Sequence, residues 1–262
     1  MPELPEVETV VRELNHNIKG KIIKEIQPVY DKVFSVGSEP EILKGFKIAT
    51  VKRRAKYIIF NFANSPLHLI SHLRMTGEYL YNQDIEKNRF VRCIFRFTDN
   101  SLMAFADMRK FGRFDISDDL TKRFKDIGVE PLSDDLNFAY LKNVLNKSKP
   151  IKLQLLDQSI IAGIGNIYAD EVLFLSKINP QRQASSISEK EIKALVKNIK
   201  LVLQKAIDDT GNILPDYREK GDKGNYYNVY GQNKKKCKIC SSIIEKIILG
   251  GRGTHFCPKC QK

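Results

Sequence analysis

The sequence predicts an α+β protein in which a β-rich first half is followed by a helical second half and a short cysteine-rich tail. After a first helix, apolar residues alternate with the period of a strand up to about residue 115, and from about Leu120 they recur with the period of a helix. Two Cys-x2-Cys pairs lie within residues 237–260. A chain of 262 residues is long enough to form two domains with a sizeable core.

The first predicted element is a helix with Pro5 in its first turn. Proline suits this position because its missing N–H would have no partner there, and Glu6 and Glu8 are favoured at the positive end of the helix dipole. One apolar stripe at helical spacing then continues through Val7, Val10, Val11 and Leu14.

The residues before this helix also have a chemical interpretation. Removal of Met1 would make the secondary amine of Pro2 the chain terminus. An α-amino group titrates at roughly 7.7–8, so part of it is unprotonated and nucleophilic near neutral pH. Glu3 lies beside it and can carry protons. The alternative is an ordinary amphipathic helix behind a disordered tip, and these residues considered alone favour that alternative.

Short segments with alternating apolar residues predict strands after the first helix. They are Lys21–Ile26, Gly45–Val51, Tyr57–Phe62, Leu67–Leu73, Val91–Phe97 and Ser101–Ala106. Turn residues such as those at 63–66 and 99–100 separate them. Many short strands at regular spacing indicate an antiparallel sandwich or barrel.

Helical spacing dominates the second half. Helices are predicted at Ile151–Gln158 and Asn166–Ser176, and a longer one begins at Ser188, which forms a capping-box pattern with Glu191. The polar stretch 130–149 is expected to be a linker, and the stretch 208–228 a mobile loop.

The charge of the chain points to a polyanionic partner. The net charge is +13, and residues 213–262 hold 11 Lys and Arg against 4 Asp and Glu. Nucleic acid is favoured over an anionic membrane, because the sequence has neither a lipidation motif nor a basic amphipathic helix. No stretch approaches the ~20 apolar residues of a membrane span, and the acidic N-terminus does not resemble a secretory signal.

The cysteine pairs predict a structural zinc site. Four thiolates match a tetrahedral ion whose positions are all filled by protein, which makes the metal structural. The ligands are Cys237, Cys240, Cys257 and Cys260. Two disulfides or unrelated core cysteines are the alternatives, and the paired spacing disfavours both. A hairpin is expected between the pairs, with Arg252 in its turn, and Cys93 is expected in the core.

Six motifs together resemble the family of bacterial formamidopyrimidine-DNA glycosylases. They span the chain in order, at 2–9, 52–57, 72–77, 107–113, 161–171 and 251–262. Leu4 in the first motif is similar to this branch, whereas the endonuclease VIII branch usually has glycine there.

The resemblance implies a fold, a division into domains and a partner. It implies an N-terminal β-sandwich with flanking helices at 1–130, a linker at 131–149, a helix–two-turn–helix module with a lesion-covering loop at 150–228, and a zinc finger at 229–262. It also implies one zinc ion per chain and double-stranded DNA that contains oxidised bases or abasic sites. A bacterial, cytoplasmic monomer that acts at the nucleoid is expected.

The resemblance further implies a bifunctional base-excision enzyme that excises oxidised purines and cleaves the resulting abasic site. Pro2 would attack the sugar and form a Schiff base, and Glu3 would shuttle protons. Lys56, carried on a strand, and Arg252 complete the implied catalytic set. Lys56 considered alone would be an ordinary solvated lysine.

DNA contacts are implied for seven residues, namely Glu6, Met75, Arg89, Arg109, Phe111, Asn166 and Tyr230. Met75, Arg109 and Phe111 would fill the gap left by a flipped nucleotide, although Met75 considered alone would be assigned to the core. Asn166 and Arg252 would grip phosphates beside the lesion. Glu6 would position the amine and the flipped nucleotide.

The sequence departs from the family's pattern in two places. Lys87-Asn88-Arg89-Phe90 replaces a histidine-containing run, so Arg89 is the expected substitute for a histidine phosphate contact. The loop at 216–228 is shorter than in many relatives, which bears on the preference for a damaged base.

Two other functions remain open on the sequence alone. One is an endonuclease VIII-like preference for oxidised pyrimidines, and the other is a zinc-finger protein that binds damaged DNA without cutting it. A further condition concerns Met1, because its retention would convert the nitrogen of Pro2 into an amide that is not nucleophilic.

Overall fold

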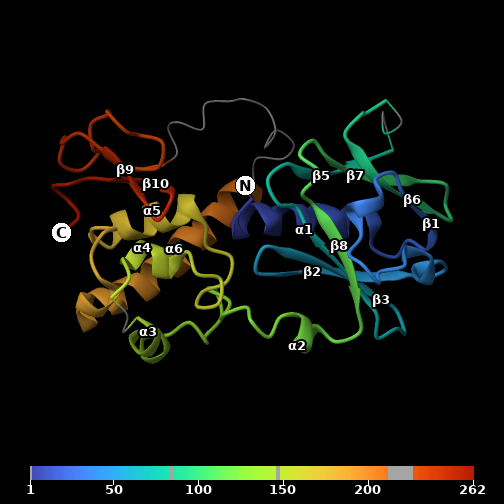
Figure 1. Ribbon diagram of the computed structural model, residues 1–262, viewed down its shortest axis with the longest axis horizontal. Coiled ribbons are helices and arrows are strands. Elements are labelled where there is room, and N and C mark those ends of the chain that lie inside the picture. The colour runs from blue at the N-terminus through green and yellow to red at the C-terminus, as the bar shows by residue number, and fades with distance from the viewer. Residues whose placement is uncertain (1, 83–84, 86, 146–147, 212–226) are drawn as a thin grey trace. The chain divides into compact units, whose positions relative to one another are not determined.

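The computed structural model describes residues 2–82, 85, 87–145, 148–211 and 227–262. The chain forms two compact units, Met1–Lys125 and Asp126–Lys262. Strands dominate the first unit and helices the second, so the predicted α+β class is confirmed (Figure 1). The predicted four-part division of the chain remains a prediction.

Two four-stranded antiparallel sheets form the first unit. One has the order β1-β6-β7-β5 and the other the order β2-β3-β4-β8. The strands are β1 (Ile23–Pro28), β2 (Ile48–Arg54), β3 (Tyr57–Phe62), β4 (His68–His72), β5 (Gly77–Tyr81), β6 (Val91–Phe97), β7 (Leu102–Asp107) and β8 (Arg113–Ser117). Short 3-10 helices η1 (Asp31–Val33) and η2 (Pro40–Leu43) follow β1.

One core joins the two sheets, as expected for a β-sandwich. Phe95 and Phe105 from the first sheet pack with Phe114 from the second, and ring centroids lie 5.5 and 5.1 Å apart. Cys93 belongs to the same buried cluster, which confirms its predicted core position. The side chain of each of these residues is at most 1% exposed.

Strands β5 and β8 were not predicted from the sequence. Both are edge strands of their sheets, and each alternates polar and apolar residues for only five positions. Edge strands carry more polar residues than central strands, because one side of their backbone is unpaired. Their short pattern therefore resembles loop sequence.

Helix α1 (Leu4–Ile18) packs on β2 and buries the face that includes Val7, Val11 and Leu14. The helix begins after Glu3, with Pro5 in the first turn as predicted. A second short helix, α2 (Leu120–Arg123), follows β8.

The second unit contains helices α3 (Phe138–Val144), α4 (Ile151–Leu155), α5 (Asn166–Leu175) and α6 (Glu189–Gly211), with a 3-10 helix η3 (Ala184–Ser186) before α6. The start of α6 follows the predicted capping box, because Glu191 accepts from the N–H of Ser188 at 2.8 Å. Its buried face includes Leu195, Ile199 and Leu203. Helix α5 packs between α4 and α6 (Figure 1).

The stretch 131–149 differs from the predicted linker. It contains α3, whose Leu141 is fully buried and which packs against α6. A single buried leucine in a short polar helix produces little periodic signal, although Asn137 is a recognisable cap that accepts from the N–H of Tyr140 at 3.0 Å.

A two-stranded hairpin, β9 (Glu245–Leu249) and β10 (Arg252–Phe256), ends the chain. Its turn consists of Gly250 and Gly251, both with positive φ, which is the requirement of a tight hairpin turn. The prediction that Arg252 lies in the turn is wrong, because this residue opens β10 and pairs with Leu249.

Most of the predicted loop at 208–228 lies outside the described residues, which resume at Tyr227. Among the helices of the described ranges, none has both the length and the apolar character that a membrane span needs.

Candidate active site and nucleic-acid interface

The N-terminal end of α1 is held by a reciprocal capping box. The carboxylate of Glu6 accepts from the backbone N–H of Glu3 at 2.8 Å, and the Glu3 carboxylate accepts from the N–H of Glu6. Glu3 and Glu6 are only 3% and 8% exposed, and Pro2 is buried. Because the amide next to Pro2 is fixed in this way, Pro2 sits on a rigid helix end rather than on a disordered tip.

Two contacts set the direction of α1 on β2. The side-chain amide of Asn15 pairs with both backbone groups of Val51, at 2.8 and 2.7 Å, and the Glu8 carboxylate accepts from Arg53 at 2.9 Å. The start of α1 therefore lies beside the C-terminal end of β2. The turn that follows β2 contains Lys56, so Pro2 and Lys56 lie toward the same end of this pair of elements.

Lys56 differs from both sequence interpretations. It lies in the two-residue turn between β2 and β3, not on a strand, and it is only 6% exposed, so it is not a solvated surface lysine. Ala55, with φ of 54°, forms the other half of this turn. Burying a lysine costs free energy unless its ammonium has partners, which marks this turn as a built feature of the site.

His72 is a neighbour of Lys56 that lies within one of the six motifs but was not among the predicted site residues. Burial lowers the pKa of His72 to about 3, and the cations of Arg74, Lys56 and Arg123 act in the same direction. The ring packs edge-on against Tyr57 at 4.7 Å, and Nδ1 accepts from the N–H of Arg74 at 2.9 Å. The imidazole is therefore neutral and serves as an acceptor. A histidine at the end of a strand, beside a basic motif, was the available signal.

Three residues predicted to enter DNA project from two loops of the first unit. Met75 is 41% and Phe111 50% exposed, and Arg109 is also exposed, with its guanidinium 4.9 Å from the centre of the Phe111 ring. Met75 is therefore not a core residue. Exposed apolar side chains gathered beside a cation mark a contact surface rather than a packing error.

Asp107 holds these two loops together. Its carboxylate accepts from the hydroxyl of Thr76, next to Met75, and from the N–H groups of Arg109, Phe111 and Gly112 at 3.0, 2.7 and 2.7 Å. Burial would raise the pKa of Asp107, but these hydrogen bonds outweigh it and hold the pKa below its usual value. The residue is 1% exposed and links positions that are 31 residues apart.

The ring of Phe105 explains two glycines of these loops. A Cβ atom at Gly77 or Gly112 would lie 2.8 or 2.4 Å from the Phe105 ring. Only glycine lets both loops approach that ring, so Phe105 and Asp107 form one platform beneath the exposed residues.

Arg89 is exposed before β6, with its guanidinium 4.8 Å from the ring of Phe90. Its carbonyl oxygen accepts from Arg92 at 3.1 Å, and Arg92 also donates to the carbonyl of Asp107 at 2.9 Å. The backbone of this predicted phosphate contact is thus tied to the same platform.

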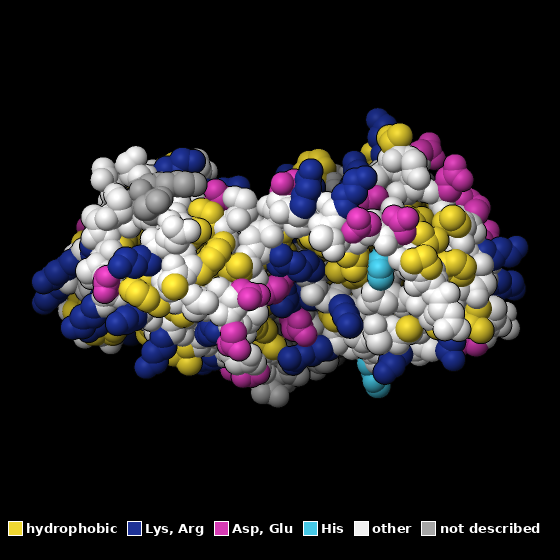
Figure 2. All heavy atoms as spheres, turned by 90° about the horizontal axis from the view of Figure 1, so that it is seen from below, with side chains coloured by type: hydrophobic (Ala, Val, Ile, Leu, Met, Phe, Trp, Pro, Cys, Tyr) yellow, Lys and Arg dark blue, Asp and Glu magenta, His cyan; other side chains and the backbone are white. Residues whose placement is uncertain are grey.

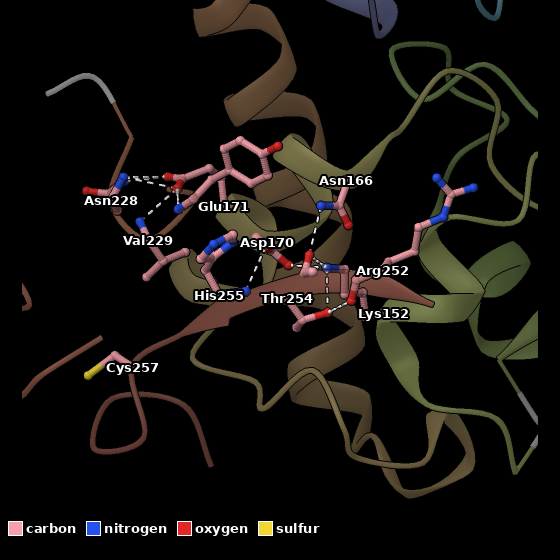
Figure 3. Close-up of polar contacts among 12 residues, drawn as sticks. Lys152, Asn166, Asp170, Glu171, Asn228, Val229, Arg252, Thr254, His255 and Cys257 are labelled. Carbon is pink, nitrogen blue, oxygen red and sulfur yellow. Dashed lines mark hydrogen bonds and ion pairs between the residues drawn. The ribbon is translucent and has the colours of Figure 1, made fainter. Parts of the chain in front are cut away.

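The other three predicted contacts lie in the second unit. Asn166 begins α5, Arg252 begins β10 with an exposed side chain, and Tyr230 packs edge-on against His255 at 5.2 Å. Figure 3 shows Asn166 reaching toward β10 and the guanidinium of Arg252 pointing away from the cluster. The amide of Asn166 donates to the carbonyl of Gly253 at 2.8 Å, so helix and hairpin are joined beside Arg252.

Two adjacent carboxylates of α5, not predicted from the sequence, organise this region. Glu171 accepts from the N–H groups of Asn228, Val229 and Tyr230 at 2.8–3.0 Å, and Asp170 accepts from the N–H of His255 at 2.9 Å (Figure 3). Both are nearly inaccessible, at 5% and 1% exposure. Carboxylates within an otherwise apolar helix were the available signal.

The four predicted cysteine ligands converge. Their sulfur atoms all lie within 4.8 Å of one another, and Cys237 and Cys257 also pack into a small core with Phe174 and Ile244. The N–H of Ile239 donates to the sulfur of Cys237 at 3.4 Å, which is the backbone geometry of a metal-binding knuckle. The set has the chemistry and closure of a structural zinc site, and the protein holds one such ion.

The predicted site residues thus form two groups, one in each compact unit of the chain. The first unit contributes Pro2, Glu3, Glu6, Lys56, Met75, Arg89, Arg109 and Phe111, and the second contributes Asn166, Tyr230 and Arg252. Lys and Arg side chains are spread over the face drawn in Figure 2 rather than confined to one patch.

Comparison with known proteins assigns the class. Residues 1–114 match the formamidopyrimidine-DNA glycosylase N-terminal domain, residues 127–216 the formamidopyrimidine-DNA glycosylase H2TH domain, and residues 234–262 the zinc finger found in FPG and IleRS. All three matches lie in the order that the sequence motifs predicted.

Individual relatives match over their whole length. The formamidopyrimidine-DNA glycosylase of Lactiplantibacillus plantarum is 41% identical over 270 residues, which covers 98% of both chains. Lactococcus lactis Fpg, solved in complex with DNA that contains an abasic site, has a TM-score of 0.91 at 39% identity and covers 99% of both chains. MutM in complex with carbocyclic 8-oxo-G containing DNA has a TM-score of 0.91 at 40% identity over 100% of both chains.

The chain therefore belongs to the formamidopyrimidine-DNA glycosylase family. This assignment makes it a DNA glycosylase of base-excision repair, with the AP lyase activity that is part of the family. The two alternative functions are not favoured.

Proposed function

We propose that this protein excises oxidised purines, 8-oxoguanine and formamidopyrimidines, from duplex DNA and cuts the remaining abasic site by successive β- and δ-elimination. The observation that carries the proposal is the rigid capping box of Glu3 and Glu6, which holds the residue before it, Pro2, at a buried helix end. A secondary amine fixed beside a carboxylate is suited to nucleophilic catalysis.

The reaction follows from these two groups. The nitrogen of Pro2 forms a bond to the anomeric carbon, the bond from that carbon to the base breaks, and the base leaves with a proton. The sugar ring opens and an iminium forms. Glu3 carries protons to and from the ring oxygen. The iminium acidifies the neighbouring C–H, two eliminations release the flanking phosphates, and hydrolysis of the imine returns the free amine.

Access to the glycosidic bond requires that the damaged nucleotide leave the base stack. We assign the resulting gap to the platform loops, in which Met75 and Phe111 supply apolar wedges and Arg109 donates to the unpaired base opposite. Their exposure and the bracing by Asp107 support this role, because a wedge must be both accessible and stiff.

The phosphate backbone would be held by cations and amides of both units. Lys56 and Arg89 are the candidates of the first unit, and Asn166, Tyr230 and Arg252 those of the second. Such contacts dominate affinity and fix the register of the protein on the duplex. We further propose that the protein acts as a monomer in the bacterial cytoplasm, at the nucleoid.

Borohydride trapping tests the proposal. Protein shown to begin at Pro2 is incubated with a duplex that contains one 8-oxoguanine opposite cytosine, and reduction should yield a covalent protein–DNA adduct. The matched control is the same chain with Met1 retained, which should give none. Absence of an adduct with the processed protein, under conditions in which it binds the duplex, would refute the lyase mechanism and support the non-catalytic alternative.

A second duplex with an oxidised pyrimidine distinguishes the remaining enzyme alternative. Faster excision of the oxidised purine is expected. The reverse order would assign the protein an endonuclease VIII-like preference.

A further inference from the structure

A fully buried ion pair lies at the centre of the second unit. Nζ of Lys152, on α4, is 2.7 Å from Oδ1 of Asp170, on α5, and both side chains are 0% exposed. Desolvation of two charges is expensive, and the attraction between them repays it only when hydrogen bonds satisfy the remaining donors and acceptors. Those remaining partners show what the pair holds.

The ammonium of Lys152 reaches the start of β10. It donates to the carbonyl of Gly253 at 3.1 Å and to the hydroxyl of Thr254 at 2.8 Å (Figure 3). The same hydroxyl lies 3.1 Å from the carbonyl of Arg252, to which it donates. One buried cation on α4 therefore fixes the carbonyls of Arg252 and of the residue after it, although these groups are far apart in the sequence.

Asp170 fixes the same strand from the other side. Its second oxygen accepts from the N–H of His255 at 2.9 Å. Asn166 lies four residues earlier on the same face of α5 and donates to the carbonyl of Gly253 at 2.8 Å. An amide nitrogen carries two hydrogens, and this contact uses one of them.

The exposed end of this arrangement consists of charged and polar donors. The guanidinium of Arg252 points away from the network and has no ion-pair partner in the described ranges (Figure 3). Arg252 directly follows the two-glycine turn and is the first residue of β10, where it pairs with Leu249. The four-cysteine site resumes only at Cys257, beyond the end of β10, so the near end of the strand is held by its pairing with β9 and by the ion pair.

We propose that Lys152 and Asp170 are positioning residues that hold Arg252 and Asn166 at one spacing for the phosphates of the DNA. The inference rests on the proposed function, in which these two residues contact the backbone. Two donors held at a fixed separation lose little freedom when they bind adjacent phosphates. An apolar pair of the same volume would fill the space at lower cost. It would also remove one of the two donors to the carbonyl of Gly253, and the ammonium that orients the Thr254 hydroxyl beside the carbonyl of Arg252.

Salt-dependent binding separates positioning from simple stabilisation. The dissociation constant is measured for a duplex with an uncleavable tetrahydrofuran abasic-site analogue at several salt concentrations. The variant Lys152→Met/Asp170→Asn keeps the net charge, the volume and an acceptor for His255. It should fold and retain zinc, bind roughly ten-fold more weakly, and show a salt slope smaller by about 0.9 for each phosphate that the variant no longer neutralises.

A matched control is the exposed pair Lys142–Glu189, whose atoms are 2.6 Å apart and whose side chains are 54% and 61% exposed. Lys142→Met/Glu189→Gln also keeps the net charge and should leave the slope unchanged. In steady-state cleavage, the buried double variant should raise KM while kcat at saturating DNA stays close to that of the unaltered protein. A lowered kcat with an unchanged salt slope would overturn the inference.

Arg252→Ala distinguishes failure of the inference from failure of the proposed function. If Arg252→Ala leaves the slope unchanged, the proposed phosphate contact itself is wrong. If it lowers the slope whereas the buried double variant does not, only the positioning role fails. The inference also requires that Arg252→Ala add almost nothing in the double-variant background.

Thr254→Val covers the case in which the double variant does not fold. It keeps the ion pair and the shape of the side chain, and removes the hydroxyl between the ammonium and the carbonyl of Arg252. A slope change of the same sign and smaller size is expected. An unchanged slope in folded Thr254→Val would count against the relay to Arg252.

Discussion

Two buried aspartates, one in each unit, hold exposed functional side chains by different means. Asp107 is satisfied by a hydroxyl and three backbone N–H groups and has no ion-pair partner among the described residues. Asp170 faces a buried ammonium. Both are 1% exposed. The neutral donors around Asp107 stiffen only the two loops that supply them. The buried ion pair of Asp170 instead joins three elements, α4, α5 and β10.

The two ways of holding a buried aspartate match the roles that we propose for the two units. In the proposed function, the first unit carries the amine of Pro2 and the wedge residues, and separate local hydrogen bonds hold the segments that bear them, so these parts can fail separately. The second unit carries the metal site and, in the same proposal, phosphate contacts through Asn166, Tyr230 and Arg252. Asn166 and Arg252 lie on one hydrogen-bond network and should fail together. Changes confined to one unit should therefore separate catalysis from binding.

The largest effect should come from retaining Met1. An amide nitrogen at Pro2 has no nucleophilic lone pair, so strand cleavage should fall on the order of 10³-fold or more. Binding to duplex with an abasic-site analogue should stay within about two-fold, because the phosphate contacts of the second unit are unchanged. Gel-based cleavage and fluorescence anisotropy measure the two quantities, and equal reductions in both would break the contrast between units.

Zinc removal should have the next largest effect. Chelation or Cys257→Ser should disrupt the four-cysteine site and the small core around Phe174 that shares its cysteines. DNA affinity should therefore fall by about a hundred-fold or more. The first unit should stay folded, because its core is separate. Anisotropy reports the binding, and hydrogen exchange in β6 and β7 reports the first unit. Preserved binding after verified metal removal would contradict the finger's role.

Asp107→Asn should act on the wedge loops alone. The introduced NH2 group would face N–H donors instead of accepting from them, so kcat/KM for a lesion-containing duplex should fall on the order of thirty-fold. The matched control is Asp115→Asn. Asp115 lies on β8 and forms a partly exposed ion pair with Arg123 of α2. Because the phosphate contacts of the second unit remain, the salt slope of binding should not change, and a change would show that the two aspartates act through one network.

The smallest effect concerns pH and His72. Its pKa in the folded protein is about 3, below the roughly 6.5 of an unfolded chain, so the unfolded state binds more protons between these values. The stability contributed is complete above pH 6.5 and is lost as the pH falls toward 3. Between pH 7 and 5.5 the decrease in the free energy of unfolding should be about 1 kcal/mol.

Urea unfolding at a series of pH values measures this decrease. His72→Gln should flatten the pH dependence of the first unit, whereas His16→Gln, at an exposed position of α1, should not. An identical slope in all three proteins would exclude His72 as its source.

Local patterns were enough to predict much of this protein. The start of α1, the capping box of α6, the central strands β3 and β6, and the four cysteine ligands could be predicted directly, because each depends on neighbours within a few positions. Edge strands and the short helix α3 were missed for the same reason, since their few apolar residues give a weak period.

The site residues divide along the same line. The roles predicted for Pro2 and Glu3 came from the resemblance of six motifs to the family, since these residues considered alone favoured an ordinary helix. The burial of Lys56 in a turn, and the partial burial of His72 beside it, depend on how β2, β3 and β4 assemble, and no local pattern records them.

What the sequence determined by itself was the zinc chemistry, the helix that begins directly after Pro2 and Glu3, and the family. What only the tertiary structure decided was the bracing of the site, since Asp107 meets Thr76 across 31 positions and Lys152 meets Thr254 across 102. A buried charge is tolerated only where distant backbone groups converge on it. That convergence arises only when the chain is folded, and no local pattern in the sequence predicts it.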